Sequence, residues 1–161
     1  MDNLMELLTG KYAEIRQRTL SALDQLDDHQ VNWSPNEASN SIANLLIHIE
    51  GNIRERIGQG INGQAYIRNR DAEFEQLVVS KAELIERTER AFDELIETAG
   101  RMTEQTLRQT QWVRGRERTH LDVLLQCATH FSEHMGQILY IAKMLLDGQY
   151  VTTTVPKKKA T

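Results

Sequence analysis

The sequence predicts an all-α protein, a four-helix bundle built as one domain. Four segments carry apolar residues at the three- and four-residue spacing of an amphipathic helix, and no long run alternates apolar with polar residues. Only two prolines and nine glycines occur in 161 residues. Apolar residues make up 40% and charged residues 26%, the balance of a globular chain with one core. We assign the bundle to residues 1–148 and expect residues 149–161 to form a flexible tail.

The first two helices are predicted from their apolar stripes and from the polar segment between them. The first helix is expected from Asn3 to Leu26. Residues 27–40 are mostly polar, so we expect a loop there, with Trp33 packed against the core. The second helix is expected from Ser41 to Ile57, and Asn40 or Ser41 is a suitable N-cap.

The connection from Gly58 to Leu77 is longer than two antiparallel neighbours need. We therefore expect a crossover that lets the third helix run parallel to the second. Arg68, Arg70, Asp71 and Glu73 crowd this connection. We favour the interpretation that these residues form solvated ion pairs at the surface. The alternative is that they form the rim of a pocket that binds an anionic substrate.

The second half of the chain contains two further helices and a second connection. Ser80 precedes the third helix, which we place from Ser80 to Ala99. Residues 101–118 are polar, and Arg114-Gly115 is a suitable turn for a short hairpin. Thr119 is a suitable cap for the fourth helix, from His120 to Leu146.

Two histidines in the fourth helix predict a metal site. His130 and His134 are four residues apart, so their side chains lie one turn apart on a half-buried face. The pair lacks the glutamate of a zinc-protease motif, because Phe131 follows His130. A third ligand must come from elsewhere, and His48 on the second helix is the best candidate, although a single histidine there is more often exposed or capped. Three imidazoles would leave an open position on zinc, nickel, iron or manganese.

The other histidines and the single cysteine are interpreted structurally. His29 lies in a polar segment and His120 begins a helix, so we expect both at the surface. Cys127 lies one turn before His130. A buried inert thiol is favoured for it over a fourth ligand or a redox partner.

Three segments resemble the DinB-like superfamily, also called the YfiT-like metal-dependent enzymes, and in particular a branch typical of bacilli. These segments are SNSIANLLIHIEGN (39–52), RNRDAEFE (68–75) and HFSEHMGQILYIAKML (130–145). The resemblance spans about residues 4–147. It implies an up-down-down-up topology and a divalent metal, zinc or nickel before iron or manganese, held by His48, His130 and His134.

The resemblance also suggests a type of reaction. Relatives in that superfamily include transferases and isomerases that use bacillithiol, mycothiol or glutathione, so the open metal position could take a low-molecular-weight thiol or a water. Glu50, Asn52 and Gln137 are candidates for the pocket or for contacts to the ligands, by adjacency alone.

Two functional hypotheses remain open at this stage. The first is a metal-dependent thiol S-transferase or related hydrolase with a small-molecule substrate. The second is a stress-related, non-catalytic module with a structural metal, and in either case a homodimer is possible. A net charge of −4, with three of the 19 basic residues at Lys157 to Lys159, argues against nucleic acid. No signal-peptide layout and no apolar run of about 20 residues occurs, which favours a cytoplasmic protein without a membrane span.

Overall fold

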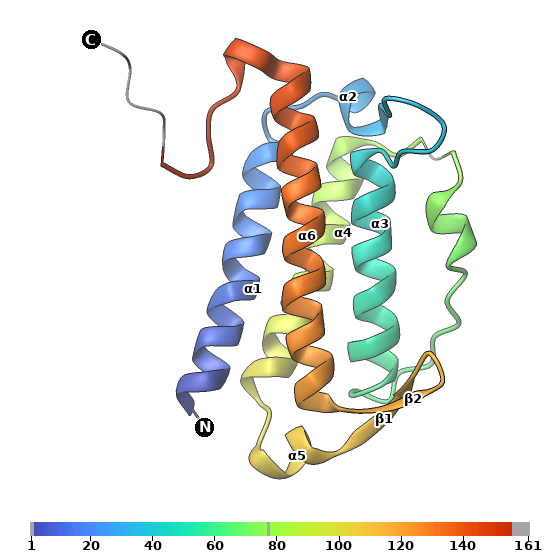
Figure 1. Ribbon diagram of the computed structural model, residues 1–161, viewed down its shortest axis with the longest axis vertical. Coiled ribbons are helices and arrows are strands. Elements are labelled where there is room, and N and C mark those ends of the chain that lie inside the picture. Colours follow the sequence, from blue (N-terminus) through green and yellow to red (C-terminus); the bar gives the residue numbers. More distant parts are fainter. Residues whose placement is uncertain (1, 77, 156–161) are drawn as a thin grey trace.

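Four long helices form the bundle in the computed structural model, which describes residues 2–76 and 78–155 (Figure 1). They are α1 (Asp2–Leu23), α3 (Ile42–Ile53), α4 (Lys81–Gly100) and α6 (His120–Leu146). Helix α1 packs against α4 and α6, and α3 packs against the same two helices from the other side. The predicted all-α four-helix bundle is confirmed.

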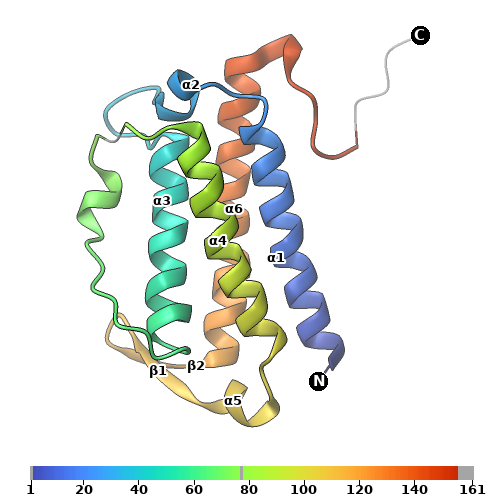
Figure 2. The same ribbon diagram turned by 180° about the vertical axis from the view of Figure 1, so that it is seen from behind.

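The helices follow an up-down-down-up path (Figures 1 and 2). Helices α1 and α6 run in one direction, and α3 and α4 both run in the other. The segment between α3 and α4 returns along the outside of α3 and contains a 3₁₀ turn, η2 (Asp71–Phe74). This segment is the crossover that its length predicts, and it lies against α3 rather than standing free in solvent.

The polar segment after α1 is more ordered than expected. Helix α1 ends at Leu23 instead of Leu26, and a short helix, α2 (Asp28–Asn32), follows. The Asp27 side chain accepts from the Gln30 backbone N–H, and the Gln30 side chain accepts from the Asp27 backbone N–H. This reciprocal capping begins a new helix inside the expected loop. Trp33 follows it and is half-buried against the core, as expected.

Helix α3 begins where its cap predicts but changes its hydrogen bonding near its end. Ser41 caps it, accepting from the Asn44 backbone N–H at 3.1 Å. After Ile53 the chain continues as a π-helical turn, η1 (Arg54–Gln59), in which the Gly60 N–H donates to the Glu55 carbonyl. The wider turn replaces the last helical turn of the predicted helix, and such turns are frequent at functional sites.

The connection from α4 to α6 contains the predicted hairpin. It consists of α5 (Glu104–Arg108), β1 (Thr110–Val113) and β2 (Arg116–Thr119), with the two strands antiparallel. Arg114 and Gly115 both have positive φ, 51° and 74°, which matches the twist of a tight two-residue turn. The hairpin lies at the end of the bundle where α3 finishes and α6 begins (Figure 1). Thr119 caps α6 as predicted, and the chain after α6 continues through η3 (Asp147–Gln149).

Apolar side chains from all four long helices fill one core. Tyr12, Phe92 and Phe131 are fully buried, and the Tyr12 hydroxyl donates to the Leu124 carbonyl at 2.7 Å. Cys127 is buried there as a free cysteine, and burial raises the pKa of its thiol to about 12.

Two observations concern the exterior of the bundle. Among the described residues, no helix has the length and apolar character needed to cross a membrane.

The backbone of Val151 exchanges two hydrogen bonds with the Gln25 side chain, at 2.7 and 3.1 Å. Of the tail predicted over 149–161, residues 156–161 lie outside the described part of the chain.

Candidate metal centre

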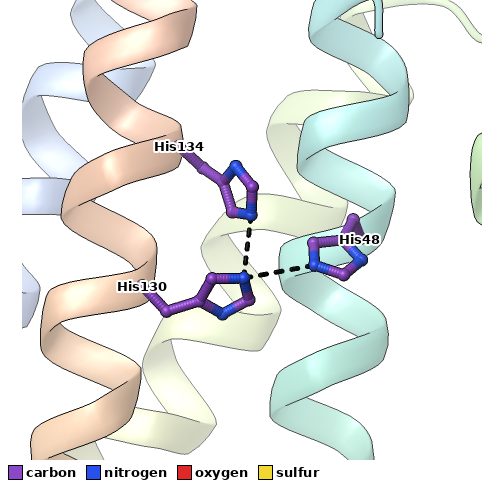
Figure 3. Close-up of side chains that lie close together, drawn as sticks. All are labelled: His48, His130 and His134. Carbon is purple, nitrogen blue, oxygen red and sulfur yellow. Dashed lines mark hydrogen bonds between the residues drawn. The ribbon is translucent and has the colours of Figure 1, made fainter.

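Three histidines from two helices meet between α3 and α6 (Figure 3). His48 is on α3, and His130 and His134 occupy successive turns of α6. The Nε2 atom of His130 lies 2.9 Å from that of His134 and 3.3 Å from that of His48. One nitrogen from each ring lies within 4.8 Å of the others, so the three form a cluster that could bind a metal ion.

The spacing and the protonation of the imidazoles suit a metal ion. Two ligands in tetrahedral geometry, each about 2.0–2.1 Å from zinc, lie about 3.3 Å apart, close to the separations found here. Burial, reinforced by His134 and His48, lowers the pKa of His130 to about 4. Burial also lowers the pKa of His48. Both rings are therefore neutral at pH 7, which is the form that ligates metals.

The outer nitrogens of two of these rings face hydrogen-bond acceptors. His48 Nδ1 lies 2.8 Å from Glu73 Oε2, and His134 Nδ1 lies 2.8 Å from Gln137 Oε1. Each acceptor holds the proton on Nδ1 and leaves the Nε2 lone pair directed into the cluster. A carboxylate or an amide oxygen behind a histidine is the usual way in which proteins orient metal-binding imidazoles.

Glu73 belongs to a buried ion-pair network that anchors the crossover. Arg68 Nε donates to Glu73 Oε1 at 2.6 Å, and Arg68 Nη1 donates to Glu55 Oε2 at 2.9 Å. The side chains of Arg68 and Glu73 are only 5% and 6% exposed. The favoured prediction of surface ion pairs is therefore wrong for these two residues, because the crossover folds back onto α3. The sequence did not identify Glu73 as a partner of His48. Its only signals were the charge crowding of residues 68–73 and its place in the segment 68–75 that resembles the DinB-like superfamily.

A glycine on α3 makes room for this network. A Cβ at Gly51 would overlap the carboxylate of Glu73 and would crowd Arg68 Nε at 3.2 Å. Gly51 is buried and lies one turn after His48, on the side that the crossover covers. Its missing side chain lets the carboxylate approach the helix closely.

The three further residues that the sequence suggested for the pocket differ in the partners of their side chains. Gln137 contacts His134, as described above. Glu50 instead pairs with Arg87 of α4 at 2.6 Å. Asn52 is 1% exposed, and within residues 2–76 and 78–155 neither polar atom of its side-chain amide has a hydrogen-bond partner.

The two other histidines lie outside the cluster. His29 is exposed on α2, as expected. His120 is 5% exposed, so the prediction of a surface position is wrong. The preceding helix α5 packs against α6, which encloses the first turn of α6.

Two cavities are lined by residues that contact the histidines, although the histidines themselves line neither. One, of about 510 Å³, is lined largely by apolar side chains, including Leu45, Tyr140 and Met144, and it reaches Gln137 behind His134. The other, of about 430 Å³, is rich in arginine and reaches Arg68 behind His48. A largely apolar cavity therefore lies behind His134, and an arginine-rich cavity lies behind His48.

Solved structures with this fold include DinB-like proteins. A DinB-like protein from Bacillus cereus has a TM-score of 0.71 at 15% identity, with 93% of this chain and 97% of that chain covered. A DinB-like protein from Bacillus subtilis, YjoA, has a TM-score of 0.65 at 18% identity, with 86% and 91% covered. A conserved protein from Enterococcus faecalis has a TM-score of 0.73 at 14% identity, with 88% and 96% covered. The fold is therefore DinB-like.

The sequence also matches a family model. The chain belongs to the family described as "Protein of unknown function (DUF1572)", whose model matches residues 2–159. No protein of curated function matches it.

Proposed function

We propose that this protein is a metal-dependent enzyme whose divalent ion, zinc or nickel, is held by His48, His130 and His134. The observation that carries the proposal is the convergence of three Nε2 atoms, two of them on rings whose Nδ1 faces an acceptor. Metal sites with three protein ligands keep a position for a substrate or a water and are typical of catalysis.

The proposed reaction class is attack of a thiol sulfur on an electrophilic carbon. A C–S bond forms, the S–H bond and the bond to the leaving group break, and the leaving group departs with the proton. The related hydrolysis uses water in place of the thiol. A divalent ion in such a site lowers the pKa of a bound thiol or water and so supplies a nucleophile at neutral pH. The protein's own contribution is orientation. Glu73 and Gln137 hold the imidazoles, and the two cavities behind them offer space for a small molecule.

The first test measures metal content in protein purified without chelator. We expect close to one ion per chain, and we expect His48→Ala to remove most of it. His29→Ala, which changes an exposed histidine outside the cluster, is the matched control. An unchanged metal content in His48→Ala would overturn the assignment of the three ligands.

The second test measures activity. Metal-loaded and chelator-treated protein are incubated with a low-molecular-weight thiol and a panel of electrophiles, and thiol consumption is followed. We expect metal-dependent consumption for at least one electrophile, lost in His134→Ala.

A non-catalytic module with a structural metal is the second candidate. Its support is the buried network that joins His48, Glu73 and Arg68, through which an ion would tie α3, α6 and the crossover together. A large fall in melting temperature on metal removal, with no thiol consumed by metal-loaded protein, would favour this second function.

A further inference from the structure

Four arginines gather around one cavity beside the histidine cluster. The cavity, of about 430 Å³, has Arg56, Arg68, Arg70 and Arg114 in its wall together with Glu55 and Trp112. These residues come from the π-helical turn, the crossover and the β1–β2 hairpin. We call it the arginine cavity.

The arginine cavity is adjacent to the histidine cluster. Arg68 Nη2 lies 3.3 Å from His48 Nδ1. Arg56 Nη1 donates to Gln126 Oε1 at 3.2 Å, and Gln126 precedes His130 by four residues, a rise of about 6 Å along α6. The cavity wall therefore lies beside the cluster, next to the outer nitrogen of His48 and about one turn of α6 from His130.

The wall of the cavity carries an excess of positive charge. Arg68 is neutralised by its pairs with Glu55 and Glu73. Arg56, Arg70 and Arg114 form no ion pair with a carboxylate within the described ranges 2–76 and 78–155.

Arg56 gives the strongest support for an anion in this cavity, because its charge is buried. It is 7% exposed, and its side chain makes one hydrogen bond, to the neutral amide of Gln126. Its Nε has no hydrogen-bond partner among the described residues. A buried charge without an opposite charge is unfavourable, and Arg56 is held in this position by the π-helical turn. Gln111 of the hairpin donates to the Arg56 carbonyl at 3.1 Å, so the hairpin also fixes this turn.

We propose that the arginine cavity binds a carboxylate or phosphate group of the small molecule that engages the histidine centre. A guanidinium presents a planar fork of donors that matches both kinds of oxyanion, and an anion there would compensate the charge of Arg56. The substrate class that follows is an anionic small molecule with its reacting group roughly one helical turn from its charge. The proposal that the cavity binds an anion depends only on the residues of the cavity. The substrate class also depends on the proposed function.

Anion binding is tested by NMR on the full-length protein. The Trp112 indole and the Arg56 Nε–H signals are followed during titration with inorganic phosphate or succinate, against chloride at the same ionic strength. We expect both signals to shift and saturate with at least one oxyanion, and the preferred one identifies the group. Trp33 directly follows α2, which lies at the opposite end of the bundle from the hairpin (Figure 1), so its indole signal should not move.

Two variants and one control make this test specific. Arg114→Gln removes an exposed charge, and Arg56→Lys keeps the buried charge but loses the fork. Each should weaken binding by about tenfold, as expected for a lost charge-assisted hydrogen bond. Arg116→Gln, on the same hairpin but outside the cavity wall, should leave it unchanged. Absence of a saturable shift, or equal affinity in all three variants, overturns the proposal.

The link to the histidine centre is tested with cobalt-loaded protein. N-acetyl-cysteinyl-glycine and its C-terminal amide carry the same thiol and differ in one carboxylate. We expect the acid to bind about tenfold more tightly, read from the sulfur-to-cobalt absorption band, and Arg114→Gln to abolish this preference. Equal affinities would overturn the anionic substrate class while the metal centre stands. Failure to bind cobalt would overturn the proposed function, and the oxyanion titration would still decide anion binding.

Discussion

At the scale of single residues, the acceptors behind His48 and His134 decide which nitrogen of each ring can bind a metal. Glu73 has this role for His48, at 2.8 Å, and Arg68 keeps the carboxylate in place. A negative charge behind the ring also raises the basicity of the opposite nitrogen. We therefore expect the metal affinity of the cluster to depend on Glu73, which is not itself one of the three histidines.

Replacement of that carboxylate is the most direct test. Glu73→Gln keeps the size of the side chain and one acceptor oxygen but removes the charge. We expect metal affinity to fall by about 10–100-fold, measured by competition with a chromogenic chelator. Glu75→Gln, an exposed neighbour on the same segment, should bind as the wild type does. Similar affinities for the two variants would show that the Glu73–His48 contact does not support the centre.

His120 gives a second prediction at this scale. Burial lowers the pKa of its imidazole, and a hydrogen bond to the Thr106 backbone opposes the shift. Its Nδ1 has no hydrogen-bond partner in the part of the chain that the structure describes. The unfolded chain takes up a proton below about pH 6.5, whereas the folded chain resists it until a lower pH. The contribution of His120 to stability is therefore complete above that pH and is lost as the pH falls.

The measurement is urea unfolding of metal-free protein between pH 7 and pH 5. Protonation of His48 and His130 also destabilises the folded state as the pH falls. The slope of the wild-type unfolding free energy against pH therefore contains contributions from all three histidines. We expect His120→Leu to flatten the slope, and His29→Leu, at an exposed position, to leave it unchanged. A His120→Leu slope equal to that of the wild type would rule out a buried neutral His120.

At the scale of the secondary-structure elements, the close approach of the crossover to α3 positions the site. Gly51 permits that approach, since any side chain there would displace Glu73. We expect Gly51→Ala to weaken metal binding by about tenfold or more through the displaced carboxylate, measured by the same chelator competition.

A second helical glycine provides the control for Gly51→Ala. Gly10 on α1 is exposed, and a Cβ there would have no atom within 4 Å. Gly10→Ala should raise the free energy of unfolding by about 0.5–1 kcal/mol through helix propensity and leave metal binding unchanged. If Gly51→Ala also retained full metal affinity, the close approach would not matter to the centre.

At the scale of the whole molecule, a metal ion would join two helices that are far apart in sequence. Binding to the folded state alone stabilises it by about 4 kcal/mol at a concentration 1,000 times Kd. For a chain of this length that corresponds to about 8–16 °C in melting temperature. We expect zinc or nickel to produce such a rise in chelator-treated protein, and His134→Asn to remove most of it.

Magnesium is the matched control ion for this measurement. It prefers oxygen ligands and should leave the melting temperature unchanged at the same concentration, because the cluster offers only imidazole nitrogens. An equal rise with magnesium, or an undiminished rise in His134→Asn, would point to binding elsewhere on the protein.

The four long helices and the positions where they begin followed from the sequence by itself. Apolar periodicity located the four long helices, and side-chain capping located the starts of α3, α4 and α6. The hairpin at Arg114-Gly115 and the spacing of His130 and His134 were equally readable. These features depend on residues within a few positions of each other, and local backbone and side-chain chemistry is sufficient to determine them.

Only the tertiary structure brought His48 within 3.3 Å of His130, 82 residues away, and set Glu73 behind it. It also buried His120 and Arg56, two polar residues whose surroundings no local pattern describes. The physical reason is that burial and long-range hydrogen bonding depend on how helices and connections pack, and packing sums many weak contacts between distant segments. The sequence determined which histidines were available, and the packing of the crossover against α3 decided which groups surround them.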